Sequence, residues 1–175
     1  MEPEKSDVHY DIAMILSGPE PQRTIFEKIL LEQAYKSTQK IIVVQGLPGA
    51  EKISKTKNQI TLVNYLDAKE LNKVICGSSL VISRSGYTSV MDYARLNTRA
   101  VLVPTPGQPE QEYLAKYLSE QKYFMSAPQT NFSLEKVLEK SETFPFRPLK
   151  FPLDLYKAFI HDLRQKKDSP LHIQQ

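Results

Sequence analysis

The chain has 175 residues, of which 41% are hydrophobic and 25% charged, and its formal net charge is +3. This composition suits one globular domain with a hydrophobic core and excludes a disordered or low-complexity chain. The lone cysteine excludes a disulfide scaffold and favours a reducing, cytoplasmic compartment. No apolar run approaches the roughly 20 residues that span a bilayer. The basic residues are scattered and predict no nucleic-acid-binding surface, and Lys52, Lys55 and Lys57 are interpreted as a solvated loop.

Short apolar runs alternate with amphipathic segments along most of the chain. Runs that are apolar at nearly every position are typical of strands buried on both faces of a parallel sheet. The predicted strands are 12–16, 41–44, 61–66, 80–83, 100–103 and a last edge strand at 123–125. The predicted helices are 22–36, 68–76, 87–97, 110–121 and one that contains Leu134, Val137 and Leu138. This alternation predicts the α/β class, a doubly wound parallel sheet with helices on both faces.

The pattern divides the chain into three parts. Residues 1–10 are predicted to be a linker, and residues 11–143 a Rossmann-like domain. Residues 144–175 begin with a connector rich in proline and aromatic residues, without any helical or strand period. The spacing of Leu155, Phe159 and Leu163 then predicts a final helix at about 153–166, followed by a frayed tail.

Ligands of doubly wound sheets bind beyond the carboxyl ends of the strands, so the loops that follow strands are the candidate sites. Loop 17–23 offers Ser17 and Gly18, where the backbone can approach a ligand, and Arg23, which can contact a phosphate. The helix that follows presents amide groups that attract anions. Taken alone, the loop is better explained as a plain turn with a surface arginine, because it lacks a G-x-G-x-x-G pattern and a P-loop lysine.

Loop 83–89 follows a strand and opens a helix. Its small hydroxyl residues and Gly86 can hold an anion at the helix start. Asp92, about one turn into the helix, can accept two hydrogen bonds from a ribose diol. Ser89 and Asp92 also fit a capping box, so a purely structural role stays open.

Loop 104–112 is rich in proline and glycine and ends in polar side chains at another helix start. Gln111 and Glu112 can bind the hydroxyls of a sugar, which need paired donors and acceptors. Each is equally explained as a polar residue at a solvated helix N-terminus.

The block from Arg84 to Tyr113 resembles the C-terminal half of GT-B glycosyltransferases of family 28, the type that transfers N-acetylglucosamine onto a lipid-linked peptidoglycan precursor. The resemblance is carried by Arg84-Ser85-Gly86 through Asp92, Arg95-Leu96-Asn97, Ala100 to Pro104 and Gln111-Glu112-Tyr113. Weaker agreement extends over about 12–140 through the order of strands and helices. The block is also similar to the small catalytic subunit of the eukaryotic dolichol-linked transferase, which works with a separate membrane partner.

The resemblance implies a donor domain that binds a nucleotide sugar, a UDP-linked hexose or N-acetylhexosamine. Together with Arg23 from the analysis of the first loop, the candidate substrate-binding residues are Ser17, Gly18, Arg84, Ser85, Gly86, Tyr87, Thr88, Asp92, Gln111 and Glu112. The two glycine loops would flank the diphosphate, Asp92 would bind the ribose, Gln111 and Glu112 the sugar, and residues 65–68 would lie near the base. The chain departs from the family in its Pro19-Glu20-Pro21, where the family has more glycine, and in Asp92 and Glu112, where the family has Glu and Gln.

The resemblance also implies a mechanism without a cofactor or metal, in which a helix N-terminus and an arginine stabilise the departing diphosphate. The sequence offers no candidate for the general base, which is expected on an N-terminal acceptor domain or a partner subunit. The chain is therefore interpreted as the donor-binding half of a hexosyltransferase, which can associate peripherally with the inner face of a membrane through the missing half. The alternative is a non-catalytic nucleotide-sugar-binding or regulatory module.

Overall fold

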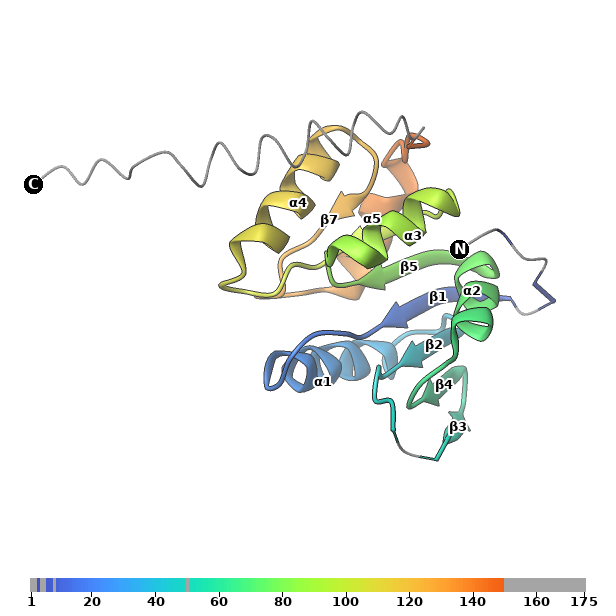
Figure 1. Cartoon of the computed structure of the whole chain (residues 1–175). Coiled ribbons are helices and arrows are strands. Elements are labelled where there is room, and N and C mark those ends of the chain that lie inside the picture. Colours follow the sequence, from blue (N-terminus) through green and yellow to red (C-terminus); the bar gives the residue numbers. More distant parts are fainter. Residues whose placement is uncertain (1–2, 4–5, 8, 50, 150–175) are drawn as a thin grey trace, which may run out of the picture.

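The computed structural model describes residues 3, 6–7, 9–49 and 51–149, which form one sheet with helices packed against it (Figure 1). The strands are β1 (Tyr10–Ile15), β2 (Ile41–Val44), β3 (Ser54–Lys57), β4 (Ile60–Val63), β5 (Ser78–Ser83), β6 (Ala100–Leu102) and β7 (Met125–Ser126). The helices are α1 (Gln22–Ala34), α2 (Ala68–Cys76), α3 (Tyr87–Arg95), α4 (Pro109–Glu120) and α5 (Leu134–Thr143).

The sheet has seven strands in the order β3-β4-β2-β1-β5-β6-β7. All neighbouring strands are parallel except β3 and β4, which form an antiparallel pair. From β1 the chain moves outward to β2 and β4, returns to β5 on the other side of β1, and then moves outward to β6 and β7. The direction of winding therefore reverses between β1 and β5, which is the topological switch point of the sheet. This arrangement confirms the predicted doubly wound α/β fold.

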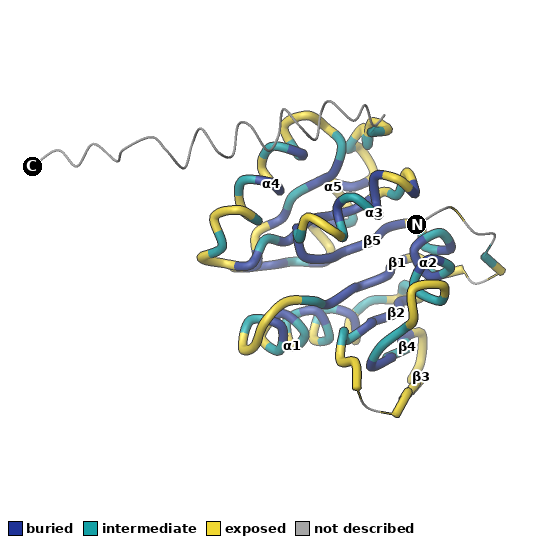
Figure 2. Tube along the Cα trace, in the orientation of Figure 1, coloured by how far each residue is buried: buried dark blue, intermediate teal, exposed yellow. Residues whose placement is uncertain are grey.

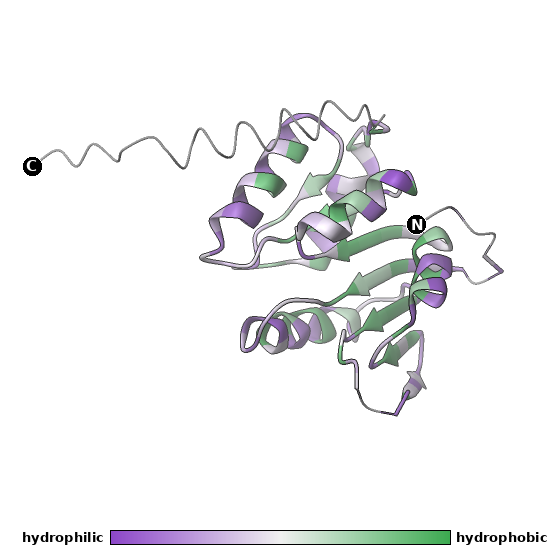
Figure 3. Ribbon diagram, in the orientation of Figure 1, coloured by the Kyte–Doolittle hydropathy of each residue, from purple (hydrophilic) through white to green (hydrophobic). Residues whose placement is uncertain are grey.

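Successive residues of β1 pack into different hydrophobic clusters, because side chains alternate between the two faces of a strand. Met14 lies in one cluster with Phe26 of α1 and Leu134 of α5. Ala13 lies in the other with Val90 of α3 and other residues of α2, α3 and α4. Both faces of the central strands are covered, which explains why their sequences are apolar without alternation. Figures 2 and 3 show these strands as the most buried and most hydrophobic part of the fold.

Most predicted elements agree with the structure, and the differences arise at their ends. The predicted helix at 68–76 coincides with α2, which begins in a capping box formed by Asp67 and Glu70. Tyr10, assigned to the linker, is already part of β1. The third predicted strand ends at Val63, because the side chain of Asn64 takes over the backbone amides of Ile53 and Tyr65. The final helix predicted at 153–166 lies outside the described residues.

The interpretation of Lys52, Lys55 and Lys57 as part of a solvated loop is wrong for two of them. Lys55 and Lys57 belong to β3, which pairs with β4 at the edge of the sheet through a tight turn at Asn58, where φ is 56°. All four residues of β3 are exposed. The sequence of this strand therefore has no alternation of apolar and polar residues that would predict it. Its lysines also suit an edge strand, because they discourage pairing with another chain.

Candidate functional site

The two loops at the switch point leave the sheet side by side. Ile15 and Ser83 are partners in the parallel register of β1 and β5, so the segments that begin at Leu16 and Arg84 start as neighbours. The first turns of α1, α3 and α4 lie at this same edge of the fold, formed by the carboxyl-terminal ends of the parallel strands, which is on the left in Figure 1. The structure therefore brings together the three loops that the sequence singled out, at the place where doubly wound folds bind ligands.

The start of α3 provides backbone amides for an anion. Gly86 is the N-cap residue, and no side chain caps the helix there. Ser85 is buried directly before it, whereas the side chains of Tyr87 and Thr88 are exposed beside it. The amides of a first helical turn carry partial positive charge, so a helix start without a side-chain cap attracts a phosphate. Asp92 lies further along the same helix and is half-buried.

The first turn of α1 differs, because a carboxylate already occupies it. Glu20 Oε2 accepts a 3.2 Å hydrogen bond from the Thr24 amide, and Glu20 also accepts from Arg23 Nε at 2.7 Å. A hydrogen bond with the Thr24 side chain, then the one from Arg23 and, to a smaller extent, the one from the Thr24 amide lower the pKa of Glu20 below its ordinary value. An anion would meet this negative charge at the start of α1. The start of α3 is therefore the better anion site of the two.

Arg23 is buried and its guanidinium is engaged within the chain. Nη1 donates to Glu27 Oε2 at 2.8 Å and to the Gln45 carbonyl at 3.3 Å, and Nη2 donates to Thr24 Oγ1 at 2.8 Å. Burial alone would lower the pKa of Arg23, but its hydrogen bonds to Glu20 and Glu27 raise it above its ordinary value. The structure thus gives Arg23 two carboxylate partners, Glu20 and Glu27.

Loop 16–21 turns sharply after β1. Gly18 has a φ of +101° and is exposed, and Ser17 is half-buried beside it. The loop after β2 approaches the end of β1 closely, because a Cβ on Gly46 would collide with the Leu16 carbonyl oxygen. Glycine is required there by a close backbone contact as well as by its φ of +67°.

Gln111 and Glu112 hold the loop that precedes α4. Gln111 Oε1 accepts hydrogen bonds from the amide and the hydroxyl of Thr105, both at 3.1 Å. Glu112 Oε1 accepts from the Gly107 amide at 3.0 Å. Both side chains therefore lie at the same edge as α3, but they stabilise their own loop in this structure. Contacts with a sugar would require part of this bonding to be exchanged.

Three polar residues near the carboxyl ends of the strands were not predicted as site residues, namely Gln22, Thr105 and Gln129. Thr105 is buried under the loop before α4, and Gln129, which follows β7, is 8% exposed. Gln129 Nε2 donates a 3.1 Å hydrogen bond to Gln22 Oε1 at the start of α1. Their position after strands is visible in the sequence, but their burial is not, since it depends on contacts between segments far apart in the chain.

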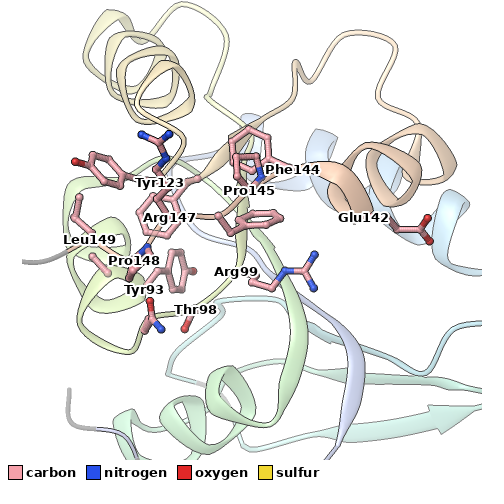
Figure 4. Close-up of a pocket in the computed structure, with 14 residues that line it drawn as sticks. Tyr93, Thr98, Arg99, Tyr123, Glu142, Phe144, Pro145, Arg147, Pro148 and Leu149 are labelled. Atoms are coloured by element: carbon pink, nitrogen blue, oxygen red, sulfur yellow. The ribbon is translucent and has the colours of Figure 1, made fainter.

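A hollow of about 530 Å3 lies at the opposite, amino-terminal ends of the strands (Figure 4). It is formed where α3 ends, where β6 and β7 begin, and where residues 144–149 pass, with Tyr93, Arg99 and Phe146 among its walls. None of the predicted substrate-binding residues lines it. Within the described part of the chain, no three His, Cys, Asp or Glu side chains are grouped to hold a metal ion, and no helix is long and apolar enough to cross a membrane.

The fold is that of a doubly wound α/β domain of the Rossmann type, and the comparison with protein families is more specific. The model described as the glycosyltransferase family 28 C-terminal domain matches residues 12–152. The chain therefore belongs to this family. This confirms the resemblance seen in the block from Arg84 to Tyr113. No curated protein sequence matches the chain.

Solved glycosyltransferase structures share the fold. The NMR solution structure of ALG13 has 15% sequence identity and a TM-score of 0.56, over 82% of this chain and 90% of that one. Acinetobacter baumannii MurG has 17% identity and a TM-score of 0.55, over 79% of this chain and 42% of that one. VinC, in complex with dTDP, has 10% identity and a TM-score of 0.56, over 95% of this chain and 39% of that one. The chain thus spans about two fifths of MurG and VinC.

Proposed function

We propose that this chain is the donor-binding half of a glycosyltransferase. It would bind a nucleoside diphosphate sugar, a UDP-linked hexose or N-acetylhexosamine, and present the sugar to an acceptor held by an N-terminal domain or a partner subunit. Membership of family 28 and the doubly wound fold support a role in sugar transfer. The observation that carries the proposal is the start of α3, which has no side-chain cap and lies beside the loop after β1.

In the proposed complex the diphosphate lies against the amides of residues 86–88 and the turn at Ser17 and Gly18. Asp92, on the same helix, accepts hydrogen bonds from the two ribose hydroxyls. Gln111 and Glu112 lie at the start of the neighbouring helix, within the same edge, and face the sugar. VinC was solved with a nucleoside diphosphate, which makes UDP and dTDP the first ligands to test.

The proposed transfer breaks the bond between the anomeric carbon and the diphosphate and forms a bond from that carbon to an acceptor oxygen. The acceptor proton passes to a base on the other half of the enzyme, and the negative charge remains on the departing diphosphate. Amides at the start of α3 stabilise that charge as it develops, without reorganising. We therefore propose that transfer does not depend on a metal ion.

Binding of UDP or dTDP to the 175-residue chain tests the proposal. A ligand that binds only the folded state raises the free energy of unfolding by about 2.7 kcal/mol at one hundred times its Kd. We expect UDP or its sugar conjugates to raise the melting temperature, and free uridine to raise it less. An unchanged melting temperature with every nucleotide at millimolar concentration would refute the proposal.

A second experiment separates transfer from mere binding. The chain is combined with candidate acceptor halves and a lipid-linked or soluble acceptor, and release of UDP is measured. Transfer that requires both components supports a donor-binding half. Nucleotide binding without transfer in any combination would favour a regulatory module instead.

A further inference from the structure

Arg84 is a buried cation that directly precedes the Ser85-Gly86 start of α3 in the chain. Its side chain is 1% exposed, and its guanidinium carbon lies 4.1 Å from the centre of the Phe26 ring. All its hydrogen bonds in the described structure go to carbonyl oxygens, and its Nε has no partner. A guanidinium has five N–H donors in a rigid planar fork, so it can hold several acceptors at fixed angles.

The acceptors belong to two loops of the site, and Arg84 itself lies in a third. Nη2 donates to the Gln22 carbonyl at 2.9 Å, at the end of the loop after β1. Nη1 donates to the carbonyls of Val103 and Pro104 at 3.3 and 3.2 Å, which follow β6. Arg84 itself directly follows β5 and precedes the Ser85-Gly86 start of α3. One side chain therefore ties together the loops that would surround a diphosphate.

Among the residues that the structure describes, no carboxylate pairs with Arg84 to balance its charge. Burial lowers its pKa below the ordinary value to about 10, so it still carries its charge at pH 7. Burying a charge without a partner is costly, and an apolar side chain would fill the same space without that cost. Arg23 provides the contrast, since it is also buried near the carboxyl ends of the strands but has Glu20 and Glu27 as partners. The excess positive charge at the switch point therefore comes from Arg84.

We propose that Arg84 is a positioning residue of the donor site, which holds the loops after β1, β5 and β6 in place and acts from beneath as a counter-charge to the bound diphosphate. This inference rests on the proposed function, because it requires a diphosphate at the start of α3. It also assigns Arg84 a role different from the direct contact implied by the family resemblance. Inside a low-dielectric edge, a charge acts on an anion several ångströms away more strongly than it would in water.

The test compares UDP with uridine in variants of the full chain, by calorimetric titration. Arg84→Met keeps the length and removes the charge. It should lower the affinity for UDP at least tenfold and the affinity for uridine by less than threefold. Arg84→Lys keeps the charge and loses the planar fork. It should lower both affinities together and keep their ratio within about threefold of the parent.

Arg99→Met is the matched control. Arg99 also donates a hydrogen bond to a backbone carbonyl, at 2.7 Å from that of Ser141, and its guanidinium carbon lies 4.7 Å from the centre of the Phe146 ring. It lies at the other end of the strands, directly before β6. Its loss should leave the ratio of the two affinities unchanged. If Arg84→Met also leaves that ratio unchanged, Arg84 is only a brace of the fold and the inference is overturned.

A measurement on the parent chain keeps the inference testable if the variants do not fold. The Nε–H of Arg84 is followed by 15N NMR while ligand is added. We expect its signal to shift with UDP and not with uridine, and an unmoved signal at saturating UDP would overturn the inference. A parent chain that binds no nucleotide would instead refute the proposed function. If the parent chain binds UDP and Arg84→Met has the same ratio of UDP affinity to uridine affinity, only the role of Arg84 is refuted.

Discussion

The Ser85 hydroxyl donates a 2.9 Å hydrogen bond to the carbonyl oxygen of Gln111, which ties the loop that opens α3 to the first turns of α4. A hydroxyl has one proton, so this bond leaves the Ser85 side chain with acceptor capacity only. A phosphate needs donors. In the proposed complex, the donors at this position are therefore backbone amides rather than the hydroxyl.

The first prediction concerns Ser85→Ala. We expect a loss of about 1 kcal/mol in the free energy of unfolding, because one buried hydrogen bond disappears. The affinity for UDP should fall less than tenfold, since the amides remain. Urea unfolding and calorimetric titration measure the two effects. A loss of affinity much greater than tenfold, with stability unchanged, would show that the hydroxyl itself binds the phosphate.

The second prediction concerns Asp92 and the ribose. A carboxylate that accepts two hydrogen bonds from a vicinal diol should make the chain prefer UDP over 2′-deoxy-UDP. Asp92→Asn should weaken UDP binding by about tenfold, which corresponds to about 1.4 kcal/mol. The variant should also lose most of the preference for the ribonucleotide.

Asp67→Asn is the control for Asp92→Asn. Asp67 caps α2 with a hydrogen bond from the Glu70 amide, and asparagine caps a helix about as well as aspartate. This variant should keep the preference for UDP. If the preference survives in Asp92→Asn as well, Asp92 does not contact the ribose and is only a polar residue of α3.

The third prediction concerns the contact between the loop after β2 and the end of β1. Gly46→Ala should lower the free energy of unfolding by about 2–4 kcal/mol, because the new methyl group overlaps the Leu16 carbonyl oxygen. Gly49→Ala is the control, since Gly49 also has a positive φ, of +95°, but open space around it. It should cost only the backbone strain, about 1 kcal/mol. Equal losses in thermal unfolding of the two variants would contradict the close approach.

The sequence predicts the sheet well because its signal is local. The apolar run of β1 arises from burial on both faces, and the capping residue Asp67 lies next to the helix that it starts. Strand β3 is not predicted, because its exposed residues carry no pattern and it is defined only by pairing with β4. The sequence therefore predicts a strand whose side chains are buried, and it does not predict an exposed strand such as β3 that is defined only by its hydrogen bonds to a neighbour.

The loops of the site are predicted because topology places them, but the state of their side chains is not. Arg84 bonds to Gln22, which lies 62 residues earlier, and Ser85 bonds to Gln111, 26 residues later. Spacing in the sequence carries no information on such contacts. Arg23, which the sequence offers as a candidate phosphate contact, likewise has contacts with Glu20 and Glu27 that its spacing does not predict.

The last prediction concerns stability at alkaline pH. Burial raises the pKa of the Tyr93 phenol from about 10 to about 12, against the hydrogen bonds with Ser83 and Ser89 that lower it. Between these values the unfolded chain loses the Tyr93 proton while the folded chain keeps it, so Tyr93 makes stability fall as pH rises through this window. Burial of Arg84 has the opposite effect, because it lowers the pKa of this side chain to about 10, so the folded chain releases the proton at a lower pH than the unfolded chain does.

Tyr93→Phe should therefore change the pH dependence in a defined direction. At pH 7 it should lower the free energy of unfolding by about 1 kcal/mol, because the hydrogen bonds of the buried hydroxyl are lost. As pH rises from 10 toward 12, this deficit should shrink, since the variant has no phenol to ionise on unfolding. Urea unfolding at pH 7, 10, 11 and 11.5 measures the trend. Tyr35→Phe is the control, because Tyr35 is 54% exposed in the parent, and this variant should follow the parent at every pH. If the deficit of Tyr93→Phe stays constant up to pH 11.5, Tyr93 ionises equally easily in the folded and unfolded states.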